Sequence, residues 1–394
     1  MKICGEILIV LVLLTVAAFS GAAAAEEMRT FVDDIGREVT LPAAVDAVSP
    51  SGPLAQIVLY SLDPDLLVSI AREFSESQKK YIDPRLLTLP VTGNFYGSKA
   101  STMNAESIMA MDKELHIDVV LDVGEVKDTM ESDFDDIFRK TNVTFAFVTQ
   151  NTLDDIPGSY LKLGRLLSRE EQGQRLSNYT SLLLAEFAAG MAKIGDNKKS
   201  LIYVTAVDGN SVSMMGKGSY HAEVIDYVGN NVVPSAVSGS GRGDDYTMED
   251  VLRMNPDFII VSSTTDHAYY KKILSDPMWQ SLSAVKNGNV YEAPNGPYNW
   301  MGGPPSVHRL LSLIWLGNLM YPDVFDYSID SRVKEFYSLF FHYELTDAEL
   351  NELMVYAKPH ASPTTTQTPV PIAGICAGVS VVVLGLSFRR TCRP

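Results

Sequence analysis

A nine-residue pattern occurs twice in this chain, with an offset of 143 residues. The first copy, at 104–112, reads Asn-Ala-Glu-Ser-Ile-Met-Ala-Met-Asp, and the second, at 247–255, reads Thr-Met-Glu-Asp-Val-Leu-Arg-Met-Asn. Each copy opens with a good helix-capping residue, places a glutamate in the first turn and precedes an apolar run that an aspartate introduces. The repeat predicts two lobes of similar fold, although helix–strand units of any α/β protein share some of these features.

Short apolar runs alternate with amphipathic segments along the chain. The predicted buried strands are 45–49, 119–123, 145–149, 201–207 and 258–262. Such alternation is typical of α/β folds with mostly parallel sheets. Together with the repeat, it predicts two α/β lobes, residues 26–155 and 195–358.

The segment between the predicted lobes, residues 156–194, has an almost continuous helical pattern. Ser168 begins a capping box, Ser-Arg-Glu-Glu, that would restart the helix after Leu167. A helical stretch of roughly 35 residues spans about 50 Å, which is enough to cross both lobes. We therefore expect one rigid helix to join the lobes and to limit hinge motion.

Both ends of the chain are predicted to lie outside the lobes. Lys2 precedes an apolar run and then small residues, which is typical of a secretory signal peptide over 1–25 rather than of a buried helix. Residues 359–369 are rich in Thr and Pro and predict an extended stalk. An uncharged apolar stretch at 370–388 predicts a transmembrane helix, and the basic tail 389–394 places that end in the cytoplasm. The apolar stretch could instead be a signal removed during lipid anchoring.

The lobes are thus expected outside the cytoplasm, on a single-pass protein of the cell membrane. The chain has 3 Cys, and because Cys4, Cys376 and Cys392 all lie in the end segments, the lobes contain no disulfide or thiolate metal ligand. The formal net charge of −16 argues against nucleic acid as the main partner, because phosphate binding needs a basic face.

The sequence lacks the motifs of the common hydrolases and nucleotide-binding enzymes. It contains no H-E-x-x-H zinc pair, no G-x-S-x-G nucleophile turn and no Walker loop. We therefore expect a binding protein without a cofactor rather than an extracellular metallohydrolase. A surface or structural protein would more often show β-rich repeats.

Three stretches carry a resemblance to a known family. The first, at 31–42, reads Phe-Val-Asp-Asp-Ile-Gly-Arg-Glu-Val-Thr-Leu-Pro, and the second is the pair of glutamate-bearing helices. The third runs from Asn-Gly-Pro-Tyr-Asn-Trp at 295–300 through Gly-Gly-Pro-Pro-Ser-Val-His-Arg-Leu-Leu at 302–311 to Leu-Met-Tyr-Pro at 319–322. In this order, over about residues 29–343, they resemble the substrate-binding proteins of ABC importers for ferric siderophores, haem and cobalamin.

The resemblance implies two α/β lobes joined by one long helix, with the ligand held between them. It implies an iron or cobalt complex as cargo, with a ferric siderophore or haem ahead of cobalamin, and an ABC permease dimer with a cytoplasmic ATPase as partner. It also implies that Glu106 and Glu249, one exposed acid on each lobe, dock onto the permease. The alternative for both glutamates is that they only complement a helix dipole.

Loops at the carboxyl ends of strands are expected to line the cleft of such a fold. The ligand-binding candidates from these loops are Ser51, Phe95, Tyr96, Lys217, Ser219, Arg242, Tyr246, Tyr298, Trp300 and His308. Tyr298 and Trp300 offer flat aromatic faces that suit a planar or chelated ligand, unless their loop packs onto its own lobe. His308 could ligate iron or donate to a chelate, or it could be satisfied locally at a helix start.

A bare metal ion or an oxyanion is the alternative cargo. A bare cation needs three or four converging ligands, for which His308, His267 and Asp244 are the candidates. His267 follows a predicted strand and precedes Tyr269 and Tyr270, although this segment could also be a solvated loop. The spacing of these residues does not show that they converge, so an iron complex is the favoured cargo.

Overall fold

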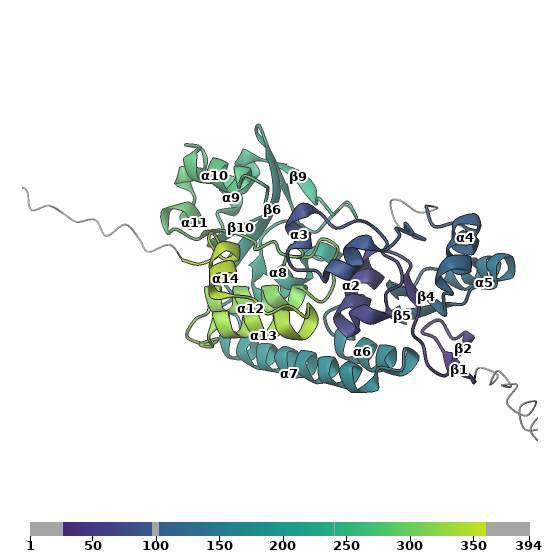
Figure 1. Ribbon diagram of the computed structural model, residues 1–394. Coiled ribbons are helices and arrows are strands. Elements are labelled where there is room, and N and C mark those ends of the chain that lie inside the picture. Colours follow the sequence, from purple (N-terminus) through teal and green to yellow (C-terminus); the bar gives the residue numbers. More distant parts are fainter. Residues whose placement is uncertain (1–26, 97–101, 240, 360–394) are drawn as a thin grey trace, which may run out of the picture. The chain divides into compact units, whose positions relative to one another are not determined.

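The computed structural model describes residues 27–96, 102–239 and 241–359 (Figure 1). The predicted signal peptide, transmembrane helix and cytoplasmic tail, and all but the first residue of the predicted stalk, lie outside these ranges. Within the ranges, no helix combines the length and the apolar character that crossing a membrane requires.

The N-terminal lobe is built on a small parallel sheet. Its strands are β3 (Val48–Pro50), β4 (Val119–Gly124) and β5 (Phe145–Thr149), in the order β3-β4-β5. An antiparallel hairpin of β1 (Met28–Val32) and β2 (Glu38–Pro42) precedes them. The helices of the lobe are α2 (Pro53–Leu62), α3 (Glu76–Lys79), α4 (Ala105–Leu115) and α5 (Met130–Thr141), with the 3₁₀ helices η1 (Pro64–Leu66) and η2 (Pro84–Thr88). Every residue of β4 is buried, as its apolar run predicts for a parallel strand.

Two helices, rather than one, connect the lobes. α6 (Asp155–Leu166) and α7 (Glu170–Ile194) are separated by a break at which Ser168 has a φ of 55°. The predicted capping box does not form, because Ser168 Oγ donates to the Ala43 carbonyl at 2.9 Å instead. The break falls where the sequence predicts the helix to restart, but the connection is not the one rigid helix that was expected, and α7 alone, with 25 residues, spans about 37 Å.

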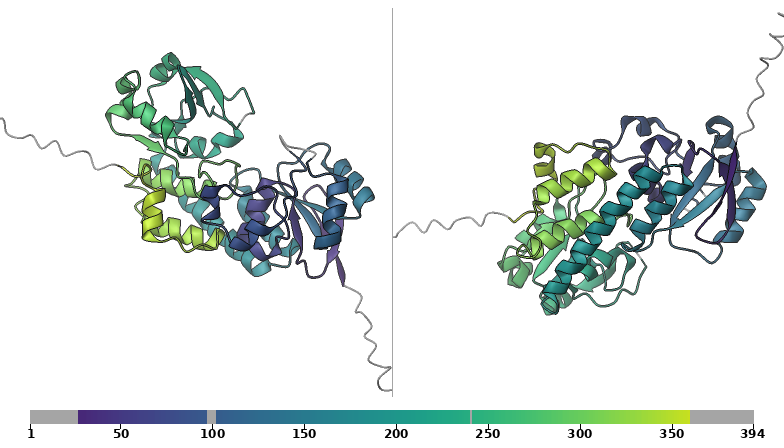
Figure 2. Two further views of the ribbon diagram at one scale, coloured as in Figure 1. Left: turned by 45° about the horizontal axis from the view of Figure 1, so that its top comes forward. Right: turned by 90° about the horizontal axis from the view of Figure 1, so that it is seen from below.

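α6 packs closely along the first part of α7 (Figure 2). Two glycines make this approach possible, since a Cβ on Gly173 would lie 2.5 Å from the Tyr160 carbonyl oxygen and 2.9 Å from Gly164 Cα. No side chain fits in that space, so the two helices are interlocked where the connection begins.

The C-terminal lobe contains a mixed sheet. Its strands are β6 (Ser200–Asp208), β7 (Ser211–Met214), β8 (Asn230–Asn231), β9 (Asp244–Thr247), β10 (Phe258–Val261) and β11 (Val290–Glu292). The order is β11-β10-β6-β7-β9, and β8 also pairs with β6. β10 pairs in parallel with β11 and β6, and β8 pairs in parallel with β6, whereas β7 runs antiparallel to both β6 and β9. The expectation of mostly parallel sheets therefore holds only in part for this mixed sheet. The helices of the lobe are η3 (Tyr220–Ala222), α8 (Glu223–Val228), α9 (Met248–Met254), α10 (Ala268–Ser275), η4 (Trp279–Ser281) and α11 (Ser283–Lys286).

Three terminal helices contact both lobes. They are α12 (Arg309–Met320), α13 (Ile329–Phe340) and α14 (Asp347–Leu353). α12 packs on α8 of the C-terminal lobe, whereas α13 packs on α2 of the N-terminal lobe. The largest hydrophobic core accordingly runs through both lobes and includes Leu121 of β4, Phe187 of α7, Leu201 of β6 and Phe340 of α13.

The repeated helices begin where the sequence predicts. Asn104 caps α4 by accepting a hydrogen bond from Ser107 N at 3.0 Å, and Thr247 caps α9 by accepting one from Asp250 N at 3.3 Å. Each helix leads into a buried strand, β4 or β10. The predicted helix–strand units are therefore confirmed in both lobes, although the sheets around them differ.

Candidate functional site

A groove lies between the segment 72–81 of the N-terminal lobe and loops of the C-terminal lobe. It consists of two adjoining pockets that share Ser77 and Asn295 in their walls. We name them the Arg72 pocket, with a volume of about 520 Å³, and the Glu292 pocket, with about 540 Å³. The C-terminal lobe contributes residues that follow β10 and β11, and ligands of α/β folds bind at such carboxyl ends. This inter-lobe groove is the candidate site.

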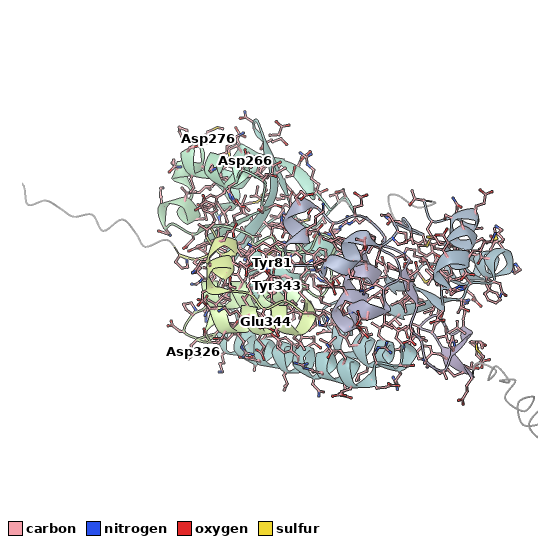
Figure 3. All side chains as sticks on the ribbon, in the orientation of Figure 1. Tyr81, Asp266, Asp276, Asp326, Tyr343 and Glu344 are labelled. Carbon is pink, nitrogen blue, oxygen red and sulfur yellow. The ribbon has the colours of Figure 1, made fainter. Side chains whose placement is uncertain are left out.

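The N-terminal wall of the groove is held in place by local caps and by the terminal helices. Ser75 N donates to Gln78 Oε1 at 2.8 Å, which closes the capping box of α3. At the end of the segment, the ring of Tyr81 packs edge-on against Tyr343, with 5.4 Å between the ring centroids (Figure 3). Residues 72–81 therefore form a braced wall rather than a free loop.

The Arg72 pocket is lined by the guanidinium of Arg72, the exposed carboxylate of Glu73 and several amide groups. Arg72 is exposed, and its guanidinium forms no ion pair with a described residue. Gln78, Asn295 and Asn299 also line the pocket. The hydroxyl of Tyr298 has no hydrogen-bond partner among the described residues, and burial raises the pKa of Tyr298 while the nearby Arg72 cation opposes the rise. These groups could donate hydrogen bonds to an oxygen-rich anion.

The Glu292 pocket is richer in ionisable groups. His267 Nδ1 lies 2.8 Å from Glu292 Oε1, and Lys80 Nζ lies 3.0 Å from Glu352 Oε2. Glu292 is 4% exposed, and its other carboxylate oxygen has no hydrogen-bond partner in the described part of the chain. The sequence did not point to Glu292, because it ends a short apolar strand and no motif marks it.

Three predicted ligand residues gather at the carboxyl edge of the N-terminal sheet. Ser51 Oγ donates to the buried carboxyl group of Asp122, and Phe95 N donates to the Ser51 carbonyl at 2.8 Å. Tyr96 Oη donates to Asp133 at 2.9 Å. Burial raises the pKa of Asp122, and the Ser51 hydrogen bond opposes the rise. None of these residues lines either pocket of the inter-lobe groove.

Lys217 and Ser219 lie elsewhere in the C-terminal lobe. Lys217 lines a separate pocket with Lys198 and Asp226. Lys217 lies in this separate pocket because β7 runs antiparallel to β6, so that the chain returns toward the amino end of β6 before it reaches Lys217. Ser219 is a cap of η3, accepting a hydrogen bond from its backbone. Their predicted place in the inter-lobe groove is therefore wrong.

Arg242 and Tyr246 also lie outside the groove. Arg242 Nε donates to Ser213 Oγ of β7 at 3.2 Å, and Tyr246 is part of the edge strand β9. The prediction treated 242–246 as a loop, but its second half pairs with β7 as a strand. Neither side chain lines the pockets between the lobes.

The segment that follows Tyr298 packs inside the protein. Trp300 is 0% exposed, and its ring meets Trp315 edge-on with 6.4 Å between the centroids. His308 is equally buried, and the ring of Tyr298 stacks on it at 5.4 Å. Burial and the neighbouring Arg309 cation lower the pKa of His308 to about 3. The alternative of a packed loop thus agrees with the burial of Trp300. The alternative of a locally satisfied His308 is not confirmed, because neither ring nitrogen of His308 has a hydrogen-bond partner among the described residues, although the side chain presents no surface to a ligand.

The predicted metal ligands do not converge. His267 pairs with Glu292, whereas Asp244 accepts hydrogen bonds from the backbone N–H groups of Val237 and Ser238 at 2.8 and 2.9 Å. His308 lies in the core. Across residues 27–96, 102–239 and 241–359, no group of three or more His, Cys, Asp or Glu side chains could hold a metal ion. The three-residue site is therefore a wrong prediction for this part of the chain.

Comparisons with known proteins point in one direction. A family model described as periplasmic binding protein matches residues 115–297. The Fe(3+)-citrate-binding protein YfmC of Bacillus subtilis is 23% identical over 142 residues, which is 36% of this chain and 43% of that protein. The high-affinity heme uptake system protein IsdE of Staphylococcus aureus is 24% identical over 216 residues, 54% of this chain and 70% of that protein. The match thus spans less than half of the first relative.

A solved structure is similar over most of the chain. The ABC transporter solute binding protein from Sulfurospirillum deleyianum superposes with a TM-score of 0.73 and 26% sequence identity. The superposition covers 83% of this chain and 99% of that one. The two-lobed α/β architecture is therefore shared with a solute-binding protein.

Proposed function

We propose that the chain, which matches the periplasmic binding protein family over residues 115–297, is the receptor of an ABC importer and captures an iron complex outside the cytoplasm. The inter-lobe groove would hold the complex, and a permease dimer with a cytoplasmic ATPase would receive it. The names of two relatives, which specify iron citrate and haem, support an iron complex as cargo.

The observation that carries the proposal is the guanidinium of Arg72, which forms no ion pair with the residues that the structure describes and lies beside the amides of Asn295 and Asn299. A chelate with surplus carboxylate oxygens, such as ferric citrate, would find charge-assisted donors there. The net charge of −16 repels such an anion at long range, but Arg72 acts within a Debye length, about 8 Å. Tyr298, in the same wall, is a further proposed contact.

Glu106 and Glu249 are the proposed docking residues. Both are exposed, and each lies in the first turn of the repeated helix of its lobe. A permease dimer presents two equivalent surfaces, so one acid per lobe at matching positions suits it. The predicted membrane helix would keep the receptor near the permease and raise its effective concentration.

Titration of the purified full chain with ferric citrate and with haem tests the proposal. We expect Arg72→Ala to weaken ferric citrate binding about tenfold, which is the loss of one charge-assisted contact. Arg139→Ala, which removes an exposed arginine from α5, is the matched control and should leave binding unchanged. Binding of free ferric ion or molybdate without any iron complex would favour the alternative of a bare metal ion or oxyanion.

A further inference from the structure

The Glu292 pocket contains the buried carboxylate of Glu292, of which one oxygen forms a hydrogen bond and the other forms none with the described residues. Glu292 Oε1 accepts from His267 Nδ1 at 2.8 Å, while Oε2 has no partner among the described residues. A buried carboxylate oxygen without a donor is costly, so a donor that enters the pocket gains a hydrogen bond that the empty pocket lacks.

The charges around this carboxylate favour a cation. Three acids, Glu76, Glu292 and Glu352, line the pocket, and they face one lysine, Lys80. Lys80 already pairs with Glu352 at 3.0 Å, and Glu76 pairs with Lys79 at 2.6 Å. Within the described ranges, the imidazole of His267 is the one basic side chain that pairs with Glu292, so the pocket keeps an excess of negative charge at its buried end.

The walls suit an organic cation better than a bare metal ion. The ring of Tyr356 lies 4.5 Å from that of His267. On the opposite lobe's side of the pocket, the ring of Tyr81 already has Lys80 Nζ 5.4 Å from its centroid, so Tyr356 and His267 supply the aromatic faces for a ligand. Aromatic faces attract ammonium groups, and the hydroxyls that follow β10 add acceptors. A bare metal ion would need three or more ligands together, and no such group exists in the described ranges.

We propose that the Glu292 pocket binds a primary ammonium group, with Glu292 Oε2 as its main acceptor. The Arg72 pocket is continuous with it through Ser77 and Asn295, so one elongated ligand could occupy both. The ammonium site itself does not depend on the proposed function. Only the assignment of the ammonium group to the bound iron complex rests on that function. The source of the ammonium group is either an arm of the bound iron complex or a free small amine.

The first experiment compares two probes of equal length on the full chain. We expect 1,4-diaminobutane to bind in calorimetric titration and 1,4-butanediol, which lacks the charge, not to bind. Glu292→Gln keeps the shape of the side chain and should weaken diaminobutane binding about tenfold or more. Glu352→Gln, which removes an exposed acid from the same pocket, should change it less than threefold. Equal binding of amine and diol, or an unchanged affinity in Glu292→Gln, would overturn the proposal.

The second experiment identifies the source of the ammonium group. Ferrioxamine B carries a pendant ammonium that N-acetylation removes without touching the iron-binding groups. If the cargo supplies the ammonium, the unmodified complex should bind about tenfold more tightly than the acetylated one, and Glu292→Gln should abolish the difference. Diaminobutane binding without this preference would indicate a free amine. Iron-complex binding without any amine binding would overturn the ammonium site and leave the proposed function intact.

Discussion

The guanidinium of Arg309, at the start of α12, forms an ion pair with the carboxylate of Glu223, at the start of α8. Glu223 Oε1 also accepts a hydrogen bond from Leu153 N at 2.8 Å, and Arg309 donates to the Asn151 carbonyl at 3.3 Å. Residues 151–153 lead from β5 into α6, so the ion pair connects the C-terminal lobe to the segment that follows the last strand of the N-terminal sheet. Burial raises the pKa of Glu223, and Arg309 opposes the rise.

Replacing Arg309 should destabilise the protein strongly. Arg309→Met leaves a partly buried carboxylate unpaired, and we expect the free energy of unfolding to fall by about 3 kcal/mol. The control is Arg332→Met, which breaks a more exposed pair with Glu186 at 2.7 Å and should cost about 1 kcal/mol or less. Urea unfolding of both variants measures the difference, and equal losses would show that the Arg309 pair has no special role.

The buried His308 should make the protein sensitive to acid. Its pKa is lowered from 6.5 to about 3, so below pH 6.5 the unfolded chain binds a proton that the folded chain does not. The contribution of this group to stability is therefore lost as the pH falls from about 6.5 to about 3, and roughly 2 kcal/mol should be missing at pH 4.5.

His308→Phe removes this titration and keeps a ring beside Tyr298. Unfolding measurements at pH 7 and pH 4.5 should therefore show a smaller acid-induced loss in the variant than in the wild type. Parallel losses in both proteins would contradict a role for His308.

The contact between α6 and α7 predicts opposite effects for two glycines. Gly173→Ala would place a Cβ against the Tyr160 carbonyl, and we expect a loss of about 1–3 kcal/mol from the forced separation of the helices. Gly158→Ala, in α6, meets nothing within 4 Å and should stabilise the helix by about 0.5–1 kcal/mol. Thermal unfolding distinguishes the two, and a neutral Gly173→Ala would mean that the helices separate at little cost.

The docking residues predict a separation of binding from transport. Replacing Glu106 and Glu249 together by Ala should reduce uptake by cells at least about tenfold, because contact with the permease is lost, while affinity for the cargo stays the same. Glu114→Ala, at the other end of α4, is the control and should transport normally. A loss of cargo affinity in the double variant would contradict the docking role.

Much of the fold could be predicted where local pattern and burial agree. The strands at 119–123 and 145–149 are continuous apolar runs, and both are buried in the structure. The strand β9 escaped prediction because its residues are polar and alternate in exposure at a sheet edge. The restart of the helix after Leu167 could be predicted, but the capping box at Ser168 could not be excluded from the sequence, because the backbone of Ser168 adopts a left-handed conformation.

The candidate site was harder to predict, because it depends on contacts between distant segments. His267 and Glu292 are 25 residues apart and meet only through the pairing of β10 with β11. Arg72 carries no motif, and its importance comes from a structural fact, namely that no residue of the described ranges forms an ion pair with it. Trp300 shows the opposite case, since an aromatic residue among Gly and Pro looked accessible in the sequence but fills the core.

The hydroxyl of Tyr60 in α2 donates to the carbonyl of Phe341, 281 residues further along the chain, at 2.9 Å. During synthesis, α2 is therefore made long before the segment that covers it. The packing of α2 against this segment is therefore completed only after nearly all of the described chain has emerged. A polypeptide that is still unfolded is the form that a secretion channel can thread, so the late completion of this packing suits a protein made on one side of a membrane and folded on the other.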